Sequence, residues 1–192
     1  ITHLNSTSLV IYGERVFLFY VFACAFALPA RAQNQPYGLE ERVPNTSLLI
    51  DLEAGVPPAM ISASELFSDT AKQIVAPGII PYSVNSELWS DGAYKTRFFA
   101  LPGNAQIDFS HDNNWQFPPN AVLVKNFYLE FVKGDPSSRQ IIETRFLVKD
   151  GQSDDWKGFS YQWNDDATDA TLLRASAQLT FFIADAQAPD GL

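Results

Sequence analysis

The fold is decided at PYSVNSELWSDGAYKTRFFAL, residues 81–101. Residues 81–84 have the composition of extended chain, the centre around Trp89 is rich in turn-forming residues, and residues 94–101 have the aromatic content of a strand. Before this stretch the chain is polar and interrupted by prolines, and after it strand-like runs follow one another. We therefore expect a hinge here between an N-terminal arm and a β-sheet, with Trp89 anchoring the turn.

Strand-favouring runs alternate with short polar turns through the rest of the chain. They cover residues 94–101, 106–109, 121–133, 140–149, 156–163 and 177–184. The turn Gly134-Asp-Pro-Ser-Ser138 between the third and fourth runs predicts a hairpin. Because no crossover helix separates successive strands, the pattern predicts an antiparallel sheet.

Alternation along the strands predicts which side chains form the core. The expected core face carries Leu123, Phe127, Leu129, Phe131, Ile142, Phe146, Val148, Phe159, Tyr161, Trp163, Leu179, Phe181 and Ile183. The opposite face is expected to carry Glu143, Arg145, Lys149 and Gln162 together with the apolar Val124 and Tyr128. Those apolar side chains predict partial cover by a second sheet or by the N-terminal arm, so an antiparallel β-sandwich is the expected fold.

The segment 33–78 is expected to be an extended arm that includes one short helix. Ser62 and Glu65 have the spacing of a capping box, and apolar residues between positions 66 and 74 lie near one helical face. Pro77 and Gly78 then end the helix, predicted over residues 62–75. We expect residues 33–78 and the β part, 79–192, to pack as one domain.

The first 32 residues have the pattern of a signal peptide. An uncharged apolar run over residues 16–28 follows Arg15 and precedes Ala30-Arg31-Ala32, with cleavage expected after Ala32. The run is shorter than the roughly 20 apolar residues of a membrane span, which disfavours a retained anchor. Cys24 raises a lipid anchor as an alternative, but Phe22 and the apolar residues beyond Cys24 are atypical of one. The mature protein is therefore expected to be exported, periplasmic or extracellular, with no membrane span.

Charge and cysteine content exclude several function classes. The chain has a net charge of −9 and one cysteine, Cys24, which lies in the expected signal peptide. Residues 33–192 therefore offer no thiolate for a disulfide, a metal site or covalent haem attachment. An acidic chain is a poor binder of nucleic acid or of an anionic membrane surface. Basic partners, cations and neutral glycans stay open as partners.

Several fragments together resemble one known family. They are residues 81–93 (PYSVNSELWSDGA), 115–127 (WQFPPNAVLVKNF), 135–139 (DPSSR), 143–147 (ETRFL) and 161–172 (YQWNDDATDATL). In this order they resemble a β-rich domain of exported bacterial c-type haem proteins, similar to diheme cytochromes, and the likeness runs from about residue 41 to the end. Each fragment alone is a weak signal, so the resemblance depends on the set.

The resemblance implies an electron-transfer role for a longer protein. In that family a haem segment with Cys-x-x-Cys-His follows this domain, and some members are fused to propellers that resemble sugar dehydrogenases dependent on pyrroloquinoline quinone. It implies that this reading frame is truncated before the haem segment, that haem c belongs to the missing part, and that this chain itself holds no cofactor. The implied partners are that haem segment or a dehydrogenase domain. No haem ligand of the family maps onto a residue of this chain.

Tryptophans in turns are the best ligand-binding candidates. Trp89, with the neighbouring Asp91, and Trp156 are candidates for stacking on sugar rings, because a flat apolar ring with a polar edge suits carbohydrate. Trp163 falls on the expected core face and is expected to be structural. The acidic loop with Asp165, Asp166 and Asp169 is a calcium candidate that lacks the spacing of a known calcium loop, and a solvated turn is the alternative.

Charged residues give no catalytic pattern. His111 lies between Asp108 and Asp112 without a Gly-x-Ser-x-Gly elbow, so no catalytic residue is assigned. Lys95 and Arg97, with Asp91, are candidates for holding an anionic group; the alternative is that they pair with carboxylates such as Glu143 or cover the core with their stems.

Two functions are therefore expected as alternatives. The first is a non-catalytic scaffold or docking domain of an exported haem-c electron-transfer protein. The second is a carbohydrate-binding β-sandwich module. A hydrolase is kept as a third hypothesis only because acidic clusters exist, and whether the chain alone is an enzyme stays open.

Overall fold

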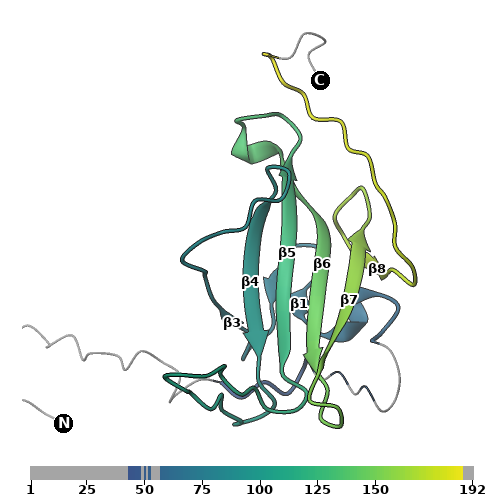
Figure 1. Cartoon of the computed structure of the whole chain (residues 1–192). Helices are drawn as coiled ribbons and strands as arrows, with labels where there is room; N and C mark the ends of the chain where they lie inside the picture. Colours follow the sequence, from purple (N-terminus) through teal and green to yellow (C-terminus); the bar gives the residue numbers. More distant parts are fainter. Residues whose placement is uncertain (1–42, 49, 51, 53–56, 188–192) are drawn as a thin grey trace, which may run out of the picture. The chain divides into compact units, whose positions relative to one another are not determined.

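The computed structural model describes residues 43–48, 50, 52 and 57–187 (Figure 1). The chain divides into two units, residues 1–40 and 41–192, and everything described here belongs to the second unit. The signal peptide predicted over residues 1–32, and the part of the predicted arm up to residue 42, lie outside the described residues.

The fold is mainly β and antiparallel, which confirms the predicted class. One sheet has six strands in the order β3-β4-β5-β6-β7-β8, so each strand pairs with its neighbours in sequence. A second sheet has two strands. The large sheet consists of β3 (Ile80–Pro81), β4 (Tyr94–Ala100), β5 (Val122–Glu130), β6 (Arg139–Lys149), β7 (Trp156–Trp163) and β8 (Ala170–Leu172), and the small one of β1 (Phe67–Asp69) and β2 (Ile74–Val75).

The predicted hairpin at residues 121–149 is confirmed as the β5–β6 pair. Gly134 takes a left-handed φ of 83°, and the 3-10 turn η2 (Pro136–Ser138) follows it. Asp135 caps this turn, because its Oδ1 accepts a hydrogen bond of 2.9 Å from the Ser137 amide. The turn chemistry visible in the sequence therefore determines how the two longest strands are joined.

One face of the large sheet is covered by the N-terminal part of the described chain. Leu48 and Ile50, the 3-10 turn η1 (Ile61–Ser64), and β1 supply apolar side chains to the core, and β1 lies behind the large sheet in Figure 1. The sheet contributes Ala100, Val122, Val124, Ile141, Phe146, Val148, Tyr161, Trp163, Ala170 and Leu172. This arrangement is sandwich-like, with a small and partly irregular second layer.

The prediction of which β5 residues face the core was wrong. Val124, expected outside, is only 1% exposed and pairs in register with Phe98 and Phe146. Directly paired residues lie on the same face of a sheet, so Leu123 and Phe127 lie on the other face. Alternation misassigned them because β5 is apolar on both faces, and period-two patterning then does not distinguish inside from outside.

The helix predicted over residues 62–75 is much shorter in the structure. Only η1 is helical, as a single 3-10 turn, and Glu65 ends it with a left-handed φ of 60°. The expected capping box does not form: Ser62 donates its amide and hydroxyl hydrogen bonds to Asp169. Leu66 and Phe67 are buried and lead into β1, whereas Ile74 in β2 is 51% exposed.

Two predicted strands are also wrong. Residues 106–109 contain no strand, only an isolated bridge between Asp108 and Gln116. Residues 177–184 form no strand either, and their one bridge is a parallel contact between Val132 and Ala184. In Figure 1 this yellow segment runs outside the sheet, so its alternating Leu179, Phe181 and Ile183 do not join the core as expected.

Candidate binding groove

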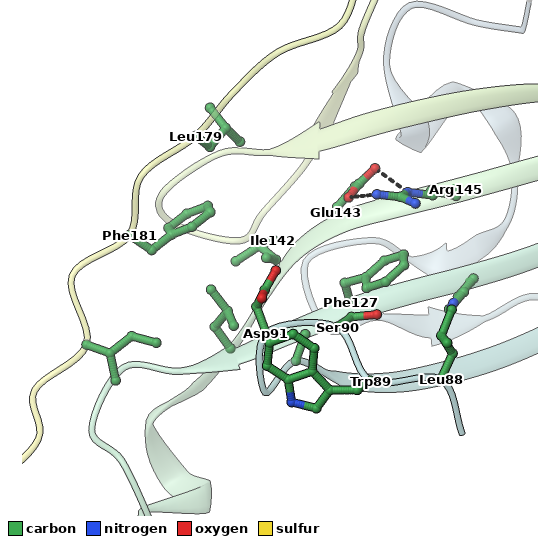
Figure 2. A pocket seen from close by; sticks show the side chains of 14 residues that line it. Leu88, Trp89, Ser90, Asp91, Phe127, Ile142, Glu143, Arg145, Leu179 and Phe181 are labelled. Carbon is green, nitrogen blue, oxygen red and sulfur yellow. Dashed lines mark hydrogen bonds and ion pairs between the residues drawn. The ribbon is translucent and has the colours of Figure 1, made fainter. Parts of the chain in front are cut away.

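The outer face of the large sheet carries an open groove of about 640 Å³, called the sheet groove below. Figure 2 shows strands at its floor, the loop with Leu88 to Asp91 on one side, and the C-terminal segment with Leu179 and Phe181 on the other. Its lining consists of Leu88, Trp89, Ser90, Asp91, Ala93, Lys125, Phe127, Leu129, Ile142, Glu143, Arg145, Leu179, Phe181 and Ile183. The groove is therefore built from four separate segments: the loop before β4, strands β5 and β6, and the C-terminal segment.

The loop before β4 is held over the sheet by two buried cations. Lys95 and Arg97 are 6% and 8% exposed. Lys95 Nζ donates a hydrogen bond of 3.0 Å to the Leu88 carbonyl, and Arg97 Nη1 forms an ion pair of 2.8 Å with Glu87. Both side chains leave the same face of β4, because they are two residues apart in one strand. They thus fix one wall of the groove.

A tight turn completes that wall. Asp91 and Gly92 have φ values of 46° and 74°, and the Ala93 amide donates a hydrogen bond of 2.8 Å to the Ser90 carbonyl. Two successive left-handed residues define a type I′ turn, for which Asp-Gly is a preferred sequence. The turn-and-strand interpretation of residues 81–101 is confirmed in this respect.

Three cations form a row across the floor of the outer face. Arg97 on β4 is in register with Lys125 on β5, and Lys125 is in register with Arg145 on β6. Arg97 pairs with Glu87, and Arg145 makes bidentate contacts of 2.6 and 2.9 Å with Glu143. No carboxylate of the described residues lies within 4 Å of Lys125 Nζ, so the central cation lacks an ion-pair partner there.

Phe127 compensates in part for this concentration of positive charge. Lys125 Nζ lies 4.8 Å from the centre of the Phe127 ring, and the Arg145 guanidinium carbon lies 4.6 Å from it. The negative face of an aromatic ring attracts cations at such distances. The ring and the two cations therefore form one unit at the middle of the sheet groove.

The pKa directions agree with this arrangement. Burial lowers the pKa of Lys125, and the positive charges of Arg97, Lys95 and Arg145 lower it further. The hydrogen bond that Arg97 donates to Glu87 lowers the pKa of Glu87, and the hydrogen bonds that Arg145 donates to Glu143 raise the pKa of Arg145. The paired groups are thus stabilised in their charged forms, whereas the charge of Lys125 is destabilised.

A bulge in β6 brings extra side chains to the groove. The pairing shifts between Phe127, which faces Glu143, and Tyr128, which faces Ile141, so Ile142 has no partner on β5. Bulges re-aim side chains relative to a regular ladder. Ile142 and Glu143 consequently both line the groove although they are consecutive in the strand.

The sequence-predicted ligand candidates separate into two places. Trp89 and Asp91 both line the sheet groove, and Trp89 is 75% exposed, so it does not anchor the turn by burial as expected. Trp156 is not part of this groove. Its ring packs edge-on against Phe117 with 5.3 Å between centroids, and Lys149 Nζ lies 5.6 Å from its centre.

Trp163 is structural, as predicted. It is buried, packs edge-on against Phe67, and donates a hydrogen bond of 2.9 Å from Nε1 to Thr144 Oγ1. Thr144 in turn donates to Asn126 Oδ1 at 2.7 Å. This buried chain of three polar groups links β5, β6 and β7 beneath the groove.

The acidic loop is a side-chain-stabilised turn. Asn164 Oδ1 accepts hydrogen bonds from the amides of Thr168 and Asp169, while Asp169 itself accepts from Ser62. Asp165 and Asp166 are exposed. No group of three or more metal-ligating side chains occurs among the described residues, so the structure does not gather the calcium candidates into a site.

His111 lies apart from the groove. It is 89% exposed, and its Nδ1 lies 2.9 Å from Asp112 Oδ1. Among the described residues its ring is hydrogen-bonded to Asp112 and to no hydroxyl or thiol, so no catalytic triad forms around it. Lys95 and Arg97, the other charged candidates, pair with the loop carbonyl and Glu87 rather than with Glu143.

Sequence reasoning missed Lys125, Phe127 and Arg145 as site residues. Phe127 was assigned to the core, and Lys125 and Arg145 were not connected because their pairing depends on the strand register. The alternating cations of residues 95–97 and the single lysine in the apolar run 121–127 were the available signal. Only the β4–β5–β6 register turns them into one row.

Comparison with protein-family models, with curated proteins and with solved structures found no match. Among the described residues, no helix has the length and apolar character needed to cross a membrane. The fold and the groove define the described part of the chain as a β domain with one open, cation-bearing face.

Proposed function

We propose that this chain is a non-catalytic docking domain of an exported haem-c electron-transfer protein. The observation that carries the docking role is the composition of the sheet groove, where apolar side chains, an exposed tryptophan and a row of cations share one open face. The resemblance in sequence supplies the expected partner, a c-type haem segment encoded after this domain.

The two faces of the sheet are used differently. One face is covered by residues of the N-terminal part and forms the core. The other exposes Leu88 and Trp89 in the lining of the groove. Apolar groups gathered on one exposed face mark interaction sites, and tryptophan and arginine are enriched among the residues that dominate interface energies.

The chemistry of the groove fits recognition better than catalysis. Its arginine and glutamate, Arg145 and Glu143, neutralise each other through a bidentate contact. Its described lining residues include no cysteine, histidine or threonine, and the one hydroxyl, Ser90, lies in the tight turn. Among the described residues, Ser90 has no hydrogen bond to a base that could activate its hydroxyl, which is the usual arrangement for covalent catalysis.

The first test concerns the partner. The gene sequence beyond the codon for Leu192 is expected to encode Cys-x-x-Cys-His, and an open frame without this motif would remove the haem partner from the proposal. Where the motif is found, the haem segment is expressed separately and added to the ¹⁵N-labelled 192-residue chain.

Docking predicts amide shift changes at groove residues on β5 and β6. The control is the acidic loop around Asp165, whose amides are expected to stay unchanged. Shift changes absent from the groove, or spread evenly over the surface, would contradict docking at this face.

Carbohydrate binding is the second candidate, and the exposure of Trp89 favours it. The ring is 75% exposed and stands beside Ser90 and Asp91, whose oxygens are suited to sugar hydroxyls (Figure 2). Stacking of a sugar on this ring is expected to change its fluorescence. Titration with soluble neutral polysaccharides tests it, with Trp89→Ala as the variant and Trp115→Ala, another exposed tryptophan, as the control.

A further inference from the structure

We propose that the sheet groove binds a carboxylate at Lys125, and that the docking partner is an acidic peptide segment whose apolar side chains fill the groove beside it. This inference rests on the docking function proposed above and adds the chemistry of the partner. It is carried by the cation row Arg97, Lys125 and Arg145 and by the walls around it.

The cations on this face outnumber the carboxylates that pair with them. Four cations, Lys95, Arg97, Lys125 and Arg145, lie on adjacent strands of one face. Two of them have carboxylate partners, Glu87 and Glu143, and Lys95 is held by a backbone carbonyl. Lys125 alone among the four has only the Phe127 ring as a described contact. An incoming carboxylate would complete its coordination.

Without a ligand, the charge of Lys125 destabilises the folded protein because of the register between strands β4, β5 and β6. Lys125 stands directly opposite a cation on each side, Arg97 and Arg145. Like charges directly opposite each other destabilise a sheet. Within the groove lining, Glu143 pairs with Arg145, so Lys125 is the cation that is left for a negative group of a ligand.

The walls select the kind of molecule that bears the carboxylate. Of the lining residues, Leu88, Leu129, Ile142, Leu179, Phe181 and Ile183 are aliphatic or aromatic. Beyond the cations, the polar lining is limited to Ser90, Asp91 and Glu143. A free inorganic anion would leave these apolar walls in water, and a uronic acid sugar would find few partners for its hydroxyls. A glutamate or aspartate flanked by leucine-like side chains satisfies both parts of the groove.

Binding is tested with a synthetic peptide in which glutamate and leucine alternate over eight residues. The ¹⁵N-labelled 192-residue chain is titrated with it, and shift changes are expected at Lys125, Phe127 and Arg145. Lys125→Gln is expected to weaken binding about tenfold, because it removes the cation that would pair with the carboxylate. Lys125→Arg keeps the charge and is expected to restore most of the affinity.

Two controls distinguish recognition of the carboxylate from nonspecific binding. Lys157→Gln removes a partly exposed lysine that already has Asp150 as its partner at 3.6 Å, and it is expected to leave binding unchanged. A peptide with glutamine in place of glutamate is expected to bind at least tenfold more weakly. Affinity for the acidic peptide should also fall as salt rises, since part of the groove is open to solvent.

Three results would overturn the inference. They are an acidic peptide that causes no shifts in the groove, a glutamine peptide that binds as well as the glutamate peptide, and tri-galacturonate that binds the same residues more tightly than the peptide. The outcome is separable from that of the docking function. A haem segment that docks equally well to Lys125→Gln supports the docking function and refutes carboxylate binding at Lys125. Binding of the acidic peptide without docking of the haem segment supports carboxylate binding and refutes the docking function.

Discussion

Lys125 and Arg145 stand directly opposite each other on β5 and β6, and both cations lie over the same Phe127 ring, at 4.8 and 4.6 Å from its centre. Arg97 adds a third cation in register on β4. Glu143 neutralises Arg145 and Glu87 neutralises Arg97, so the electrostatic cost falls on the lysine between them. A carboxylate bound at Lys125, as proposed above, would offset this cost.

Replacing Lys125 is therefore expected to stabilise the free protein. Lys125→Met removes like-charge pairs on two sides and keeps the aliphatic stem, with an expected gain of about 0.2–1 kcal/mol in the free energy of unfolding. Urea denaturation at neutral pH measures it. Lys157→Met is the matched control, because Lys157 has an attractive partner, Asp150, and should give no gain. A loss of stability in Lys125→Met would mean that the cation–π contact outweighs the repulsion.

The same lysine predicts a pH dependence in the alkaline range. Its pKa in the folded protein is lowered from 10.5, so between the folded pKa and 10.5 the unfolded chain binds more protons at this site. Stability contributed by this group therefore rises as pH increases through that window. The difference in unfolding free energy between Lys125→Met and the wild type should shrink toward pH 10.5. A difference that stays constant with pH would contradict the lowered pKa.

Glu87 predicts how the groove responds to acid. The hydrogen bond from Arg97 lowers the pKa of Glu87 from 4.5, so the ion pair supports the loop above that pH and is lost as pH falls through the folded pKa. Glu87→Gln should loosen the loop already at neutral pH, because it leaves Arg97 without its carboxylate. Hydrogen exchange at the amides of residues 87–90 measures this. Glu65→Gln, at the end of η1, is the control. Equal exchange rates at residues 87–90 in both variants would show that the Arg97–Glu87 ion pair does not hold the loop.

Strands were predicted correctly where turn-forming residues flank a long strand-favouring run. Predictions were wrong where apolar residues fit more than one kind of secondary structure. The β5–β6 hairpin followed from the turn around Asp135, and the buried role of Trp163 followed from its position in β7. The helix predicted over residues 62–75 was wrong because Glu65 adopts a left-handed backbone conformation, which no residue pattern in the sequence indicates. Leu179 and Phe181 alternate like a strand yet lie in a segment outside the sheet.

Only part of the candidate site could be predicted from the sequence. Trp89 and Asp91 were identifiable because a tryptophan in a Ser-Asp-Gly turn is exposed by local chemistry alone. Lys125 and Arg145 were not, because their proximity depends on the register between β5 and β6, which includes a shift at Phe127. Non-local register is set by the whole sheet and its bulge, which no single segment encodes.

The buried polar chain beneath the groove predicts a large effect from a small change. Thr144→Val preserves the shape of the side chain but leaves Trp163 Nε1 without its acceptor and Asn126 Oδ1 without its donor. Unsatisfied buried polar groups cost about 1–3 kcal/mol each, so a loss of at least about 2 kcal/mol is expected. Thr171→Val, at an exposed position in β8, should cost little. Equal stabilities of the two variants in urea denaturation would show that the hydrogen bonds of Thr144 do not contribute to stability.

Gly78 and Gly134 offer a test of how the N-terminal segment is seated on the sheet. Both have a φ of 83°, so a side chain is equally strained at either position. They differ in surroundings: a Cβ at Gly78 would lie 2.8 Å from the Asn45 backbone, whereas a Cβ at Gly134 would meet nothing within 4 Å. Gly134→Ala is expected to cost about 1 kcal/mol from backbone strain. Gly78→Ala should cost clearly more, because the buried Asn45, whose Oδ1 accepts from the Leu48 amide and whose Nδ2 donates to the Leu48 carbonyl, must move. Thermal unfolding of the two variants gives the difference directly, and equal losses would show that residues 45–48 are not packed tightly against this turn.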